Sequence, residues 1–286
     1  MISDITLGQF FPGRSPIHRL DPRTKILLAT LFIISVFLAN NPVSFAFLAI
    51  VTIVIISLSS VSFKVMLKGV KPIIFLLLFT AFLNVFMTKG AGEPLVSFWV
   101  LEIYSEGIAR ALMMALRVIM LIIGTSVLLT YTTSPISLTD GLEALLSPLK
   151  KLNMPVHTFA MMMSIALRFI PTLIEETEKI MNAQKSRGAD FTSGTIVDRA
   201  KALIPLLIPL FVSSFKRAEE LATAMECRCY RGDNNRTKLV KLEYKALDYI
   251  YLVVFVFILI TLICLTVLPY QFNLSGVIFD IILYRV

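Results

Sequence analysis

The chain has 286 residues, of which 57% are hydrophobic and only 16% are charged, and its mean hydropathy is +0.82. Soluble domains carry about 25% charged residues, so this composition excludes a soluble globular protein and predicts an integral membrane protein. The net charge of +8 does not indicate nucleic-acid binding, because the basic residues lie beside apolar segments, where the positive-inside rule and anionic lipid account for them.

Residues 1–25 are polar and lack the apolar core of a cleavable signal peptide. Four basic residues precede the first apolar segment and place the N-terminus in the cytoplasm: Arg14, Arg19, Arg23 and Lys25. Asp21-Pro22 predicts a helix start, with Asp21 as N-cap and Pro22 as the first helical residue. Two short apolar segments follow, 26–39 and 43–58, separated by Asn40-Asn41-Pro42. We favour a hairpin of two membrane spans over one long kinked helix.

Three lysines return the chain to the cytoplasm: Lys64, Lys68 and Lys71. A third span is predicted over 72–87, then an external acidic loop to Gly107, and a fourth span over 108–131. The fourth span carries Arg110 and Arg117 on one helical face. Intramembrane arginines are functional candidates, but we expect Arg110 at the membrane rim and Arg117 buried against a neighbouring helix or the acidic loop.

Residues 132–246 hold more than half of the charged residues, although several parts are strongly apolar. This mixture predicts a cytoplasmic-side helical region that packs against membrane helices without crossing. Its first element is a short amphipathic helix from Ser134-Pro135 to about Lys150-Lys151. A last span over 247–268 ends at Pro269 and places the tail outside. The predicted domains are therefore 1–131 with four spans, 132–246 on the cytoplasmic side, and 247–286 with the last span and tail.

Two units of similar layout lie within this region. The first helix starts at Pro155, is apolar over 156–170 and charged over 171–187, and stops at Gly188. Its second half has Leu173 on one face and Glu176 on the opposite, charged face. The second unit is apolar over 196–215, is charged over 216–226 and ends at Gly232. Each unit closes on a polar turn with a central arginine, Ser186-Arg187-Gly188 and Cys227-Arg228-Cys229. Helices of about 30 residues would be roughly 45 Å long.

Motifs for catalysis are not found: the chain has no phosphate-binding glycine loop, HExxH or GxSxG, and its two histidines, His18 and His157, are far apart in the sequence. Cys227 and Cys229 would supply half of a soft-metal site, but we expect reduced structural cysteines without a metal or cofactor. Spacing alone favours Arg187 and Arg228 as solvated cations near helix C-termini. The alternative is a pair of guanidinium groups that make bidentate contacts with a partner.

An N-terminal signature and the two arginine motifs occur together. The signature is Gly8-Gln9-Phe10, Pro12-Gly13-x-Ser15 and His18-x-Leu20-Asp21-Pro22-Arg23-x-Lys25, and the motifs are Gln184-x-x-Arg187-Gly188 and Ala224-Met225-Glu226-Cys227-Arg228-Cys229-Tyr230-Arg231-Gly232. Over nearly the whole chain, these residues resemble the transmembrane T components of energy-coupling factor transporters, a family that includes the cobalt-transport Q proteins. Family members carry two Ala-Arg-Gly-like motifs at the ends of coupling helices, and here cysteines flank the second arginine.

The resemblance implies an all-α integral membrane protein with about five transmembrane helices plus long cytoplasmic-side coupling helices crossing as an X. It implies the non-catalytic coupling subunit of an ATP-driven importer of vitamins or micronutrients in the cell membrane. Two ABC-type ATPase subunits, which hold the ATP and Mg²⁺, would bind Ser186, Arg187, Gly188, Cys227, Arg228 and Cys229. A small substrate-binding membrane protein, the S component, would bind Met161, Met162 and Met163. The alternatives are a self-sufficient secondary transporter or channel with Arg117 as its ionic element, and a membrane enzyme.

Overall fold

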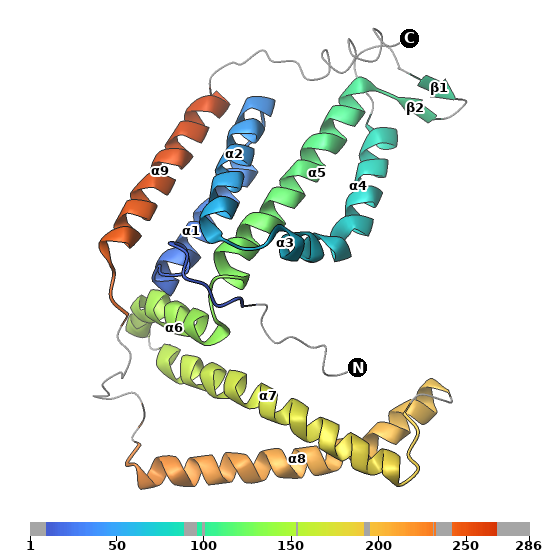
Figure 1. Cartoon of the computed structure of the whole chain (residues 1–286), viewed down its shortest axis with the longest axis vertical. Coiled ribbons are helices and arrows are strands. Elements are labelled where there is room, and N and C mark those ends of the chain that lie inside the picture. Colours follow the sequence, from blue (N-terminus) through green and yellow to red (C-terminus); the bar gives the residue numbers. More distant parts are fainter. Residues whose placement is uncertain are drawn as a thin grey trace. The chain divides into compact units, whose positions relative to one another are not determined.

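Figure 1 shows a computed structural model of the chain, which describes residues 10–88, 96–98, 101–152, 154–191, 195–230, 232 and 242–267. The regular secondary structure of the described residues is helical apart from one short two-stranded hairpin, so the predicted all-α membrane fold is confirmed. Contacts divide the chain into two compact units. The membrane unit comprises Gln9–Gly141 and Leu242–Val286, and the crossed-helix unit comprises Met1–Gly8 and Leu142–Lys241. The predicted domain boundaries at residues 131 and 246 separate membrane spans from a cytoplasmic-side region, and they stay a prediction.

The first two helices of the membrane unit are α1 (Pro22–Leu38) and α2 (Pro42–Ser59). As predicted, Asp21 is the N-cap of α1, where its carboxylate accepts a hydrogen bond from the Arg23 N–H at 2.9 Å. The chain leaves the helical conformation at Ala39 and begins again at Pro42, which lacks the N–H that a continuous helix would need. The hairpin of two helices is therefore confirmed, and the single kinked helix is wrong.

The third, fourth and last predicted spans are present with shifted ends. They are α4 (Ile74–Met87), α5 (Ser105–Thr125) with the π-helical turn η2 (Ser126–Thr130), and α9 (Ala246–Val267). The short helix α3 (Phe63–Val70) and the 3₁₀ turn η1 (Lys71–Ile73) precede α4 and were not predicted. Two strands, β1 (Val96–Phe98) and β2 (Leu101–Ile103), pair antiparallel before α5 and were not predicted. Gly8-Gln9, residues 89–95 and 99–100 of the acidic loop, and the end of the last span lie outside the described residues.

The core of the membrane unit lies among α1, α2, α5, η2 and α9, whose fully buried residues include Leu28, Phe32, Leu48, Leu128 and Leu262. Gly124 of α5 allows the closest approach in this core. A Cβ atom there would lie 2.2 Å from a ring carbon of Phe32, so only glycine lets α1 and α5 pack at this separation.

Five helices of the described chain are long and apolar enough to cross a membrane: Pro42–Ser59, Phe63–Met87, Ser105–Thr130, Val156–Ser186 and Ala246–Val267. The number agrees with the expectation of about five, but the set differs. Val156–Ser186 was predicted to pack without crossing, and it qualifies by its apolar, Met-rich first half. Pro22–Leu38 is not in the set, because it has 17 residues and begins with charged side chains.

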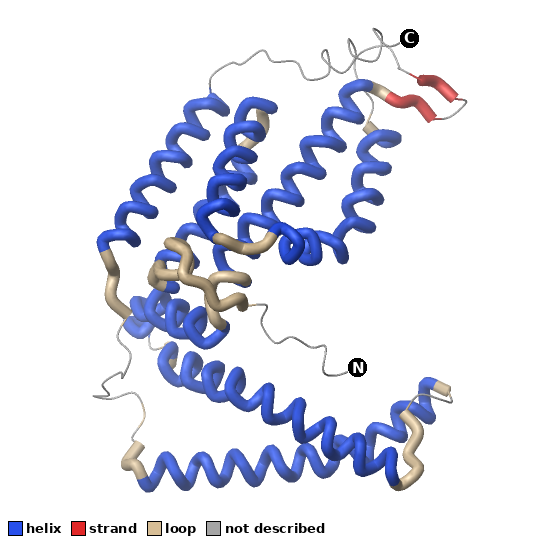
Figure 2. Tube along the Cα trace, in the orientation of Figure 1, coloured by secondary structure: helices blue, strands red, loops and turns tan. Residues whose placement is uncertain are grey.

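The crossed-helix unit consists mainly of two long helices, α7 (Val156–Ser186) and α8 (Ile196–Cys227), which are drawn as long blue tubes in Figure 2. The predicted amphipathic helix is α6 (Pro135–Leu146), and it is followed by the 3₁₀ segment η3 (Ser147–Leu152) that carries Lys150 and Lys151. Thr195 caps α8 through a reciprocal pair of hydrogen bonds with Asp198. These bonds lower the pKa of the Asp198 carboxyl, which favours its charged form at this helix start.

Candidate functional site

The helices α7 and α8 cross and pack against each other, as Figure 1 shows. An apolar crevice of about 290 Å³ lies between them and is lined by Ile165, Phe169, Leu173, Ser214, Arg217, Ala218, Leu221, Ala222 and Met225. Ala218, Leu221, Ala222 and Met225, which line it from α8, lie at helical spacing on one face of that helix. The crossing of two long helices, which the family resemblance implied, is therefore present in the chain.

One half-buried polar cluster joins the two helices where they cross. Arg217 Nη2 donates to Glu176 Oε2 at 2.5 Å, and the Ser213 hydroxyl donates to the other oxygen of the same carboxylate. The prediction that Glu176 lies on the face of α7 opposite Leu173 is wrong, because Glu176 binds α8 and Leu173 lines the crevice against the same helix. Its partner is 41 residues away in the sequence, and a charged residue can face another helix when an opposite charge and a hydroxyl satisfy it.

The end of α7 is closed by a pair of backbone hydrogen bonds around Arg187. Gly188 N–H donates to Lys185 O at 3.0 Å, and Ala189 N–H donates to Gln184 O at 3.0 Å. Gly188 has a φ of +87°, the left-handed conformation that this Schellman motif requires after the last helical turn. The predicted helix stop at Gly188 is confirmed, and Arg187 occupies the C-cap position.

The end of α8 has the same backbone without a glycine. Cys229 N–H donates to Glu226 O at 2.8 Å, Tyr230 N–H donates to Met225 O at 3.0 Å, and Arg228 is the C-cap. Cys229 takes the left-handed conformation, with a φ of +58°. The prediction that Gly232 ends this helix is wrong, because Cys229 adopts the conformation that a glycine usually supplies. The two arginine turns therefore have the same backbone structure, although their sequences differ.

Both arginines are exposed, and within the described part of the chain neither guanidinium makes a hydrogen bond or an ion pair. Each arginine follows the crossing at the same spacing, since eleven residues separate Glu176 from Arg187 and eleven separate Arg217 from Arg228. Eleven residues make about three turns and roughly 16 Å of helix. Figure 1 shows the C-terminal ends of α7 and α8 on opposite sides of the crossing. The unit thus presents two equivalent cationic tips that face different ways.

The other predicted site residues fall into two groups, one on the first half of α7 and one beside the tip arginines. Met162 and Met163 are exposed on the apolar first half of α7, whereas Met161 is half-buried. Ser186, Cys227 and Cys229 are exposed beside the arginines. Among the described residues, no group of three or more metal-ligating side chains comes together. Met162 and Met163 therefore offer an adaptable apolar surface, separate from the cationic tips.

Exchange of the two left-handed residues should show what the cysteine contributes. Left-handed backbone costs about 1–2 kcal/mol for most L-residues and nothing steric for glycine. Cys229→Gly should stabilise the end of α8 by about 0.5–1 kcal/mol, and amide exchange of Tyr230 should slow about threefold. The matched change Gly188→Cys should speed amide exchange of Ala189. Unchanged exchange in both variants would contradict the conformational interpretation.

Of the two arginines of α5, Arg117 packs against the protein. Arg117 donates to the Ala39 carbonyl at the end of α1, at 2.6 Å, and its guanidinium lies over the Phe45 ring, 5.3 Å from the centroid. Arg110 is exposed. The expectation that Arg117 packs against a neighbouring helix is confirmed, and these contacts hold it at the α1–α2 connection.

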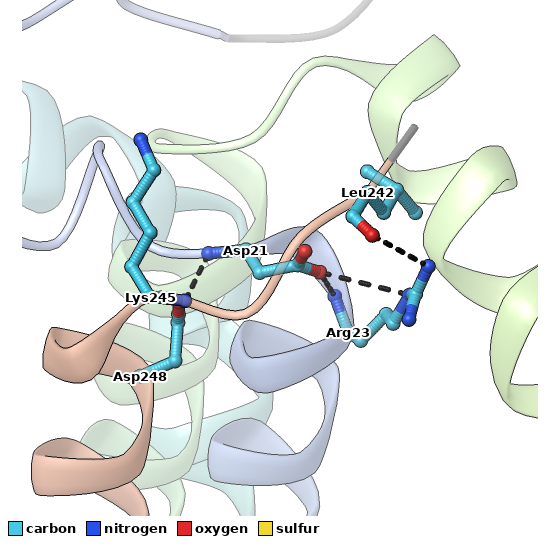
Figure 3. Close-up of polar contacts among 5 residues, drawn as sticks. All are labelled: Asp21, Arg23, Leu242, Lys245 and Asp248. Carbon is cyan, nitrogen blue, oxygen red and sulfur yellow. Dashed lines mark hydrogen bonds and ion pairs between the residues drawn. The ribbon is translucent and has the colours of Figure 1, made fainter. Parts of the chain in front are cut away.

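The N-terminal signature forms a second polar cluster, which joins the starts of α1 and α9. Figure 3 shows the Asp248 carboxylate between the two helix starts: it accepts the Asp21 N–H and the Lys245 N–H, each at 2.8 Å. Asp248 is 1% exposed. The Arg23 side chain donates to Leu242 O at 3.4 Å and lies over the Tyr244 ring, 5.2 Å from its centroid. The segment at which the chain enters α9 is therefore fastened to the start of α1.

Three further signature residues tie this region to the end of η2 and to the turn before α1. Lys25 is 2% exposed and its ammonium donates to the backbone carbonyls of Thr132, at 2.8 Å, and His18, at 3.2 Å. The Ser15 hydroxyl and His18 Nδ1 are hydrogen-bonded at 2.6 Å. The sequence pattern identified these residues by resemblance but did not indicate their partners, and it missed Asp248 altogether.

Comparison with known proteins gives consistent matches. The family model described as cobalt transport protein matches residues 13–239. The energy-coupling factor transporter transmembrane protein EcfT of Clostridium kluyveri is 54% identical over 250 residues, which cover 87% of this chain and 92% of the relative. The protein of the same name from Bacillus subtilis is 52% identical, with 87% and 93% covered. The one from Brevibacillus brevis is 52% identical, with 92% and 98% covered. The matched region includes both arginine turns.

Proposed function

The chain belongs to the family of the cobalt transport protein and the energy-coupling factor transporter transmembrane proteins, and from this membership we propose that it couples two ABC-type ATPases to a small substrate-binding membrane protein. The assembly imports vitamins or micronutrients across the cell membrane, with the N-terminus and residues 132–246 on the cytoplasmic side. The chain is non-catalytic, and its ATPase partners bind the ATP and Mg²⁺ and carry out the hydrolysis.

The observation that carries the proposal is the pair of equivalent arginine tips. Each tip has a C-cap arginine on the same hydrogen-bonded turn, eleven residues from one crossing. An exposed guanidinium at such a turn suits a bidentate contact with carboxylates or carbonyls in a groove. Two equivalent tips on opposite sides of the crossing favour two similar partners, one for each tip. Ser186 and Gly188 complete the first ATPase contact, and Cys227 and Cys229 complete the second.

The apolar first half of α7 supports a separate contact with the S component. Met162 and Met163 are 54% and 41% exposed, although apolar side chains of soluble proteins are usually buried. Met161 lies beside them in the sequence. Methionine side chains adapt their shape, which suits a surface that accepts a hydrophobic membrane partner. A secondary transporter that uses Arg117 has less support, because that guanidinium is engaged at the Ala39 carbonyl and the Phe45 ring.

Purification in mild detergent tests the proposal. The tagged chain, expressed in its own host, should retain two ATPase subunits per copy and a small apolar membrane protein. ATP hydrolysis should be found in the complex and be missing from the chain alone. Recovery of the chain as a lone oligomer that moves substrate after reconstitution would overturn the assignment.

A further inference from the structure

The short helix α3 is held firmly against the membrane unit on one side. Met66 and Val70 are 2% and 9% exposed, and Met66 belongs to the main core. Gly69 allows a close approach to η2, since a Cβ there would lie 2.6 Å from the Tyr131 hydroxyl oxygen. The 3₁₀ turn at Lys71–Ile73, which contains Pro72, then separates α3 from α4. The orientation of α3 is thus fixed by packing at the ends of two apolar helices.

The other side of α3 combines apolar and cationic groups. Phe63 and Leu67 are 65% and 52% exposed, and three exposed lysines lie beside them: Lys64, Lys68 and Lys71. At 3.6 residues per turn, Phe63 and Leu67 occupy the sector between the core-facing residues and the lysines. A helix with an apolar sector bordered by cations is typical of an element that lies in the membrane interface.

The charge of these lysines is not compensated by the chain. The sequence contains no aspartate or glutamate between Pro22 and Gly92. Within the residues that the structure describes, none of the three ammonium groups forms an ion pair or hydrogen bond. A packed helix that exposes three unpaired cations beside two apolar side chains is complementary to a lipid with an anionic headgroup.

We propose that the exposed face of α3 binds an anionic phospholipid, with the phosphate at Lys64, Lys68 and Lys71 and the acyl chains against Phe63 and Leu67. This inference concerns a ligand outside the transport assembly and does not depend on the proposed function. Each lysine near an anionic surface contributes about fivefold in affinity, so three together make a preference for anionic over zwitterionic lipid of well over tenfold.

The test measures lipid preference at α3 itself. Phe63→Trp, combined with Trp99→Phe to remove the single natural tryptophan, places one fluorophore on this face of the full-length chain. The protein is reconstituted in phosphatidylcholine membranes, and quenching by brominated phosphatidylglycerol is compared with quenching by brominated phosphatidylcholine. The ratio of the two binding constants should exceed ten. A ratio near one would overturn the proposal.

Matched variants separate a site from general charge. Lys64→Gln, Lys68→Gln and Lys71→Gln together should reduce the ratio to near one, whereas the three corresponding arginine substitutions should retain it. Removal of the same charge from three other exposed lysines, by Lys185→Gln, Lys201→Gln and Lys216→Gln, should leave the ratio unchanged. An equal fall in the control would overturn the site.

A soluble anion is the competing ligand for the same cations. Inorganic phosphate should lower the ratio no more than chloride at the same ionic strength, because binding also requires the acyl chains. Selective displacement of phosphatidylglycerol by inorganic phosphate would show a free-anion site and overturn the lipid assignment.

Discussion

Reversing both helix-tip charges, with Arg187→Glu and Arg228→Glu, should abolish transport and the co-purification of the ATPase subunits while membrane insertion stays normal. Buried interface arginines are worth about 2–4 kcal/mol each, so the loss of two weakens binding about a thousandfold or more. Within the described residues the two guanidinium groups make no hydrogen bond or ion pair, so we expect the fold to tolerate their replacement. Pull-down from solubilised membranes and uptake in cells measure the two effects.

The control for this experiment changes the same charge elsewhere on the same helices. Lys179 and Lys216 are exposed on α7 and α8, so Lys179→Glu with Lys216→Glu alters the net charge equally but leaves the tips intact. Arg187→Lys with Arg228→Lys keeps the charge and removes the planar fork, and it should retain only part of the binding. Full transport in the variant with Arg187→Glu and Arg228→Glu would contradict the proposed coupling role of the tips.

Loss of the Asp248 carboxylate should destabilise the membrane unit more than any single surface change. Asp248→Ala leaves the buried Asp21 N–H and the Lys245 N–H without their acceptor and removes a negative charge that attracts the buried Lys25 ammonium. Unpaired buried groups of this kind together cost about 3 kcal/mol or more. The midpoint of thermal unfolding in detergent should fall by about 6–12 °C.

A neighbouring acidic residue provides the comparison. Glu243 is exposed in the same segment, so Glu243→Ala should change the unfolding free energy by less than about 0.5 kcal/mol. Asp248→Asn keeps one acceptor oxygen and should be intermediate. Equal unfolding midpoints for Asp248→Ala and the unmodified protein would show that the joint between α1 and α9 does not contribute to stability.

Local chemistry explains what could be predicted from the sequence. The cap at Asp21, the break before Pro42 and the stop at Gly188 each depend on a residue and its near neighbours, and all three are confirmed. The end of α8 was missed because cysteine rarely takes a positive φ, whereas Gly232 stands four residues beyond Arg228. The sequence rule that a glycine ends the helix selected Gly232, whereas Cys229 takes the left-handed conformation that the rule expects of a glycine.

Contacts between distant residues could not be predicted. The Glu176–Arg217 pair joins residues 41 positions apart, and the Asp21–Asp248 bond joins residues 227 positions apart. A single charged residue in an apolar helix gives no sign of which partner satisfies it. Helical periodicity placed Glu176 with the other acidic residues and left Asp248 unremarked, since packing between helices decides both. The arginine tips were found, but their common geometry depended on backbone angles that sequence does not give.

The equal spacing of the two arginines from the Glu176–Arg217 pair has a mechanical consequence. If the helices pivot at this pair, each arginine lies roughly 16 Å from the pivot, measured along its own helix. A change of about 10° in the angle between α7 and α8 would move each tip by about 3 Å relative to the other helix. Because the two distances are equal, neither tip moves further than the other. Equal forces applied at the two tips would therefore do equal work on the crossing.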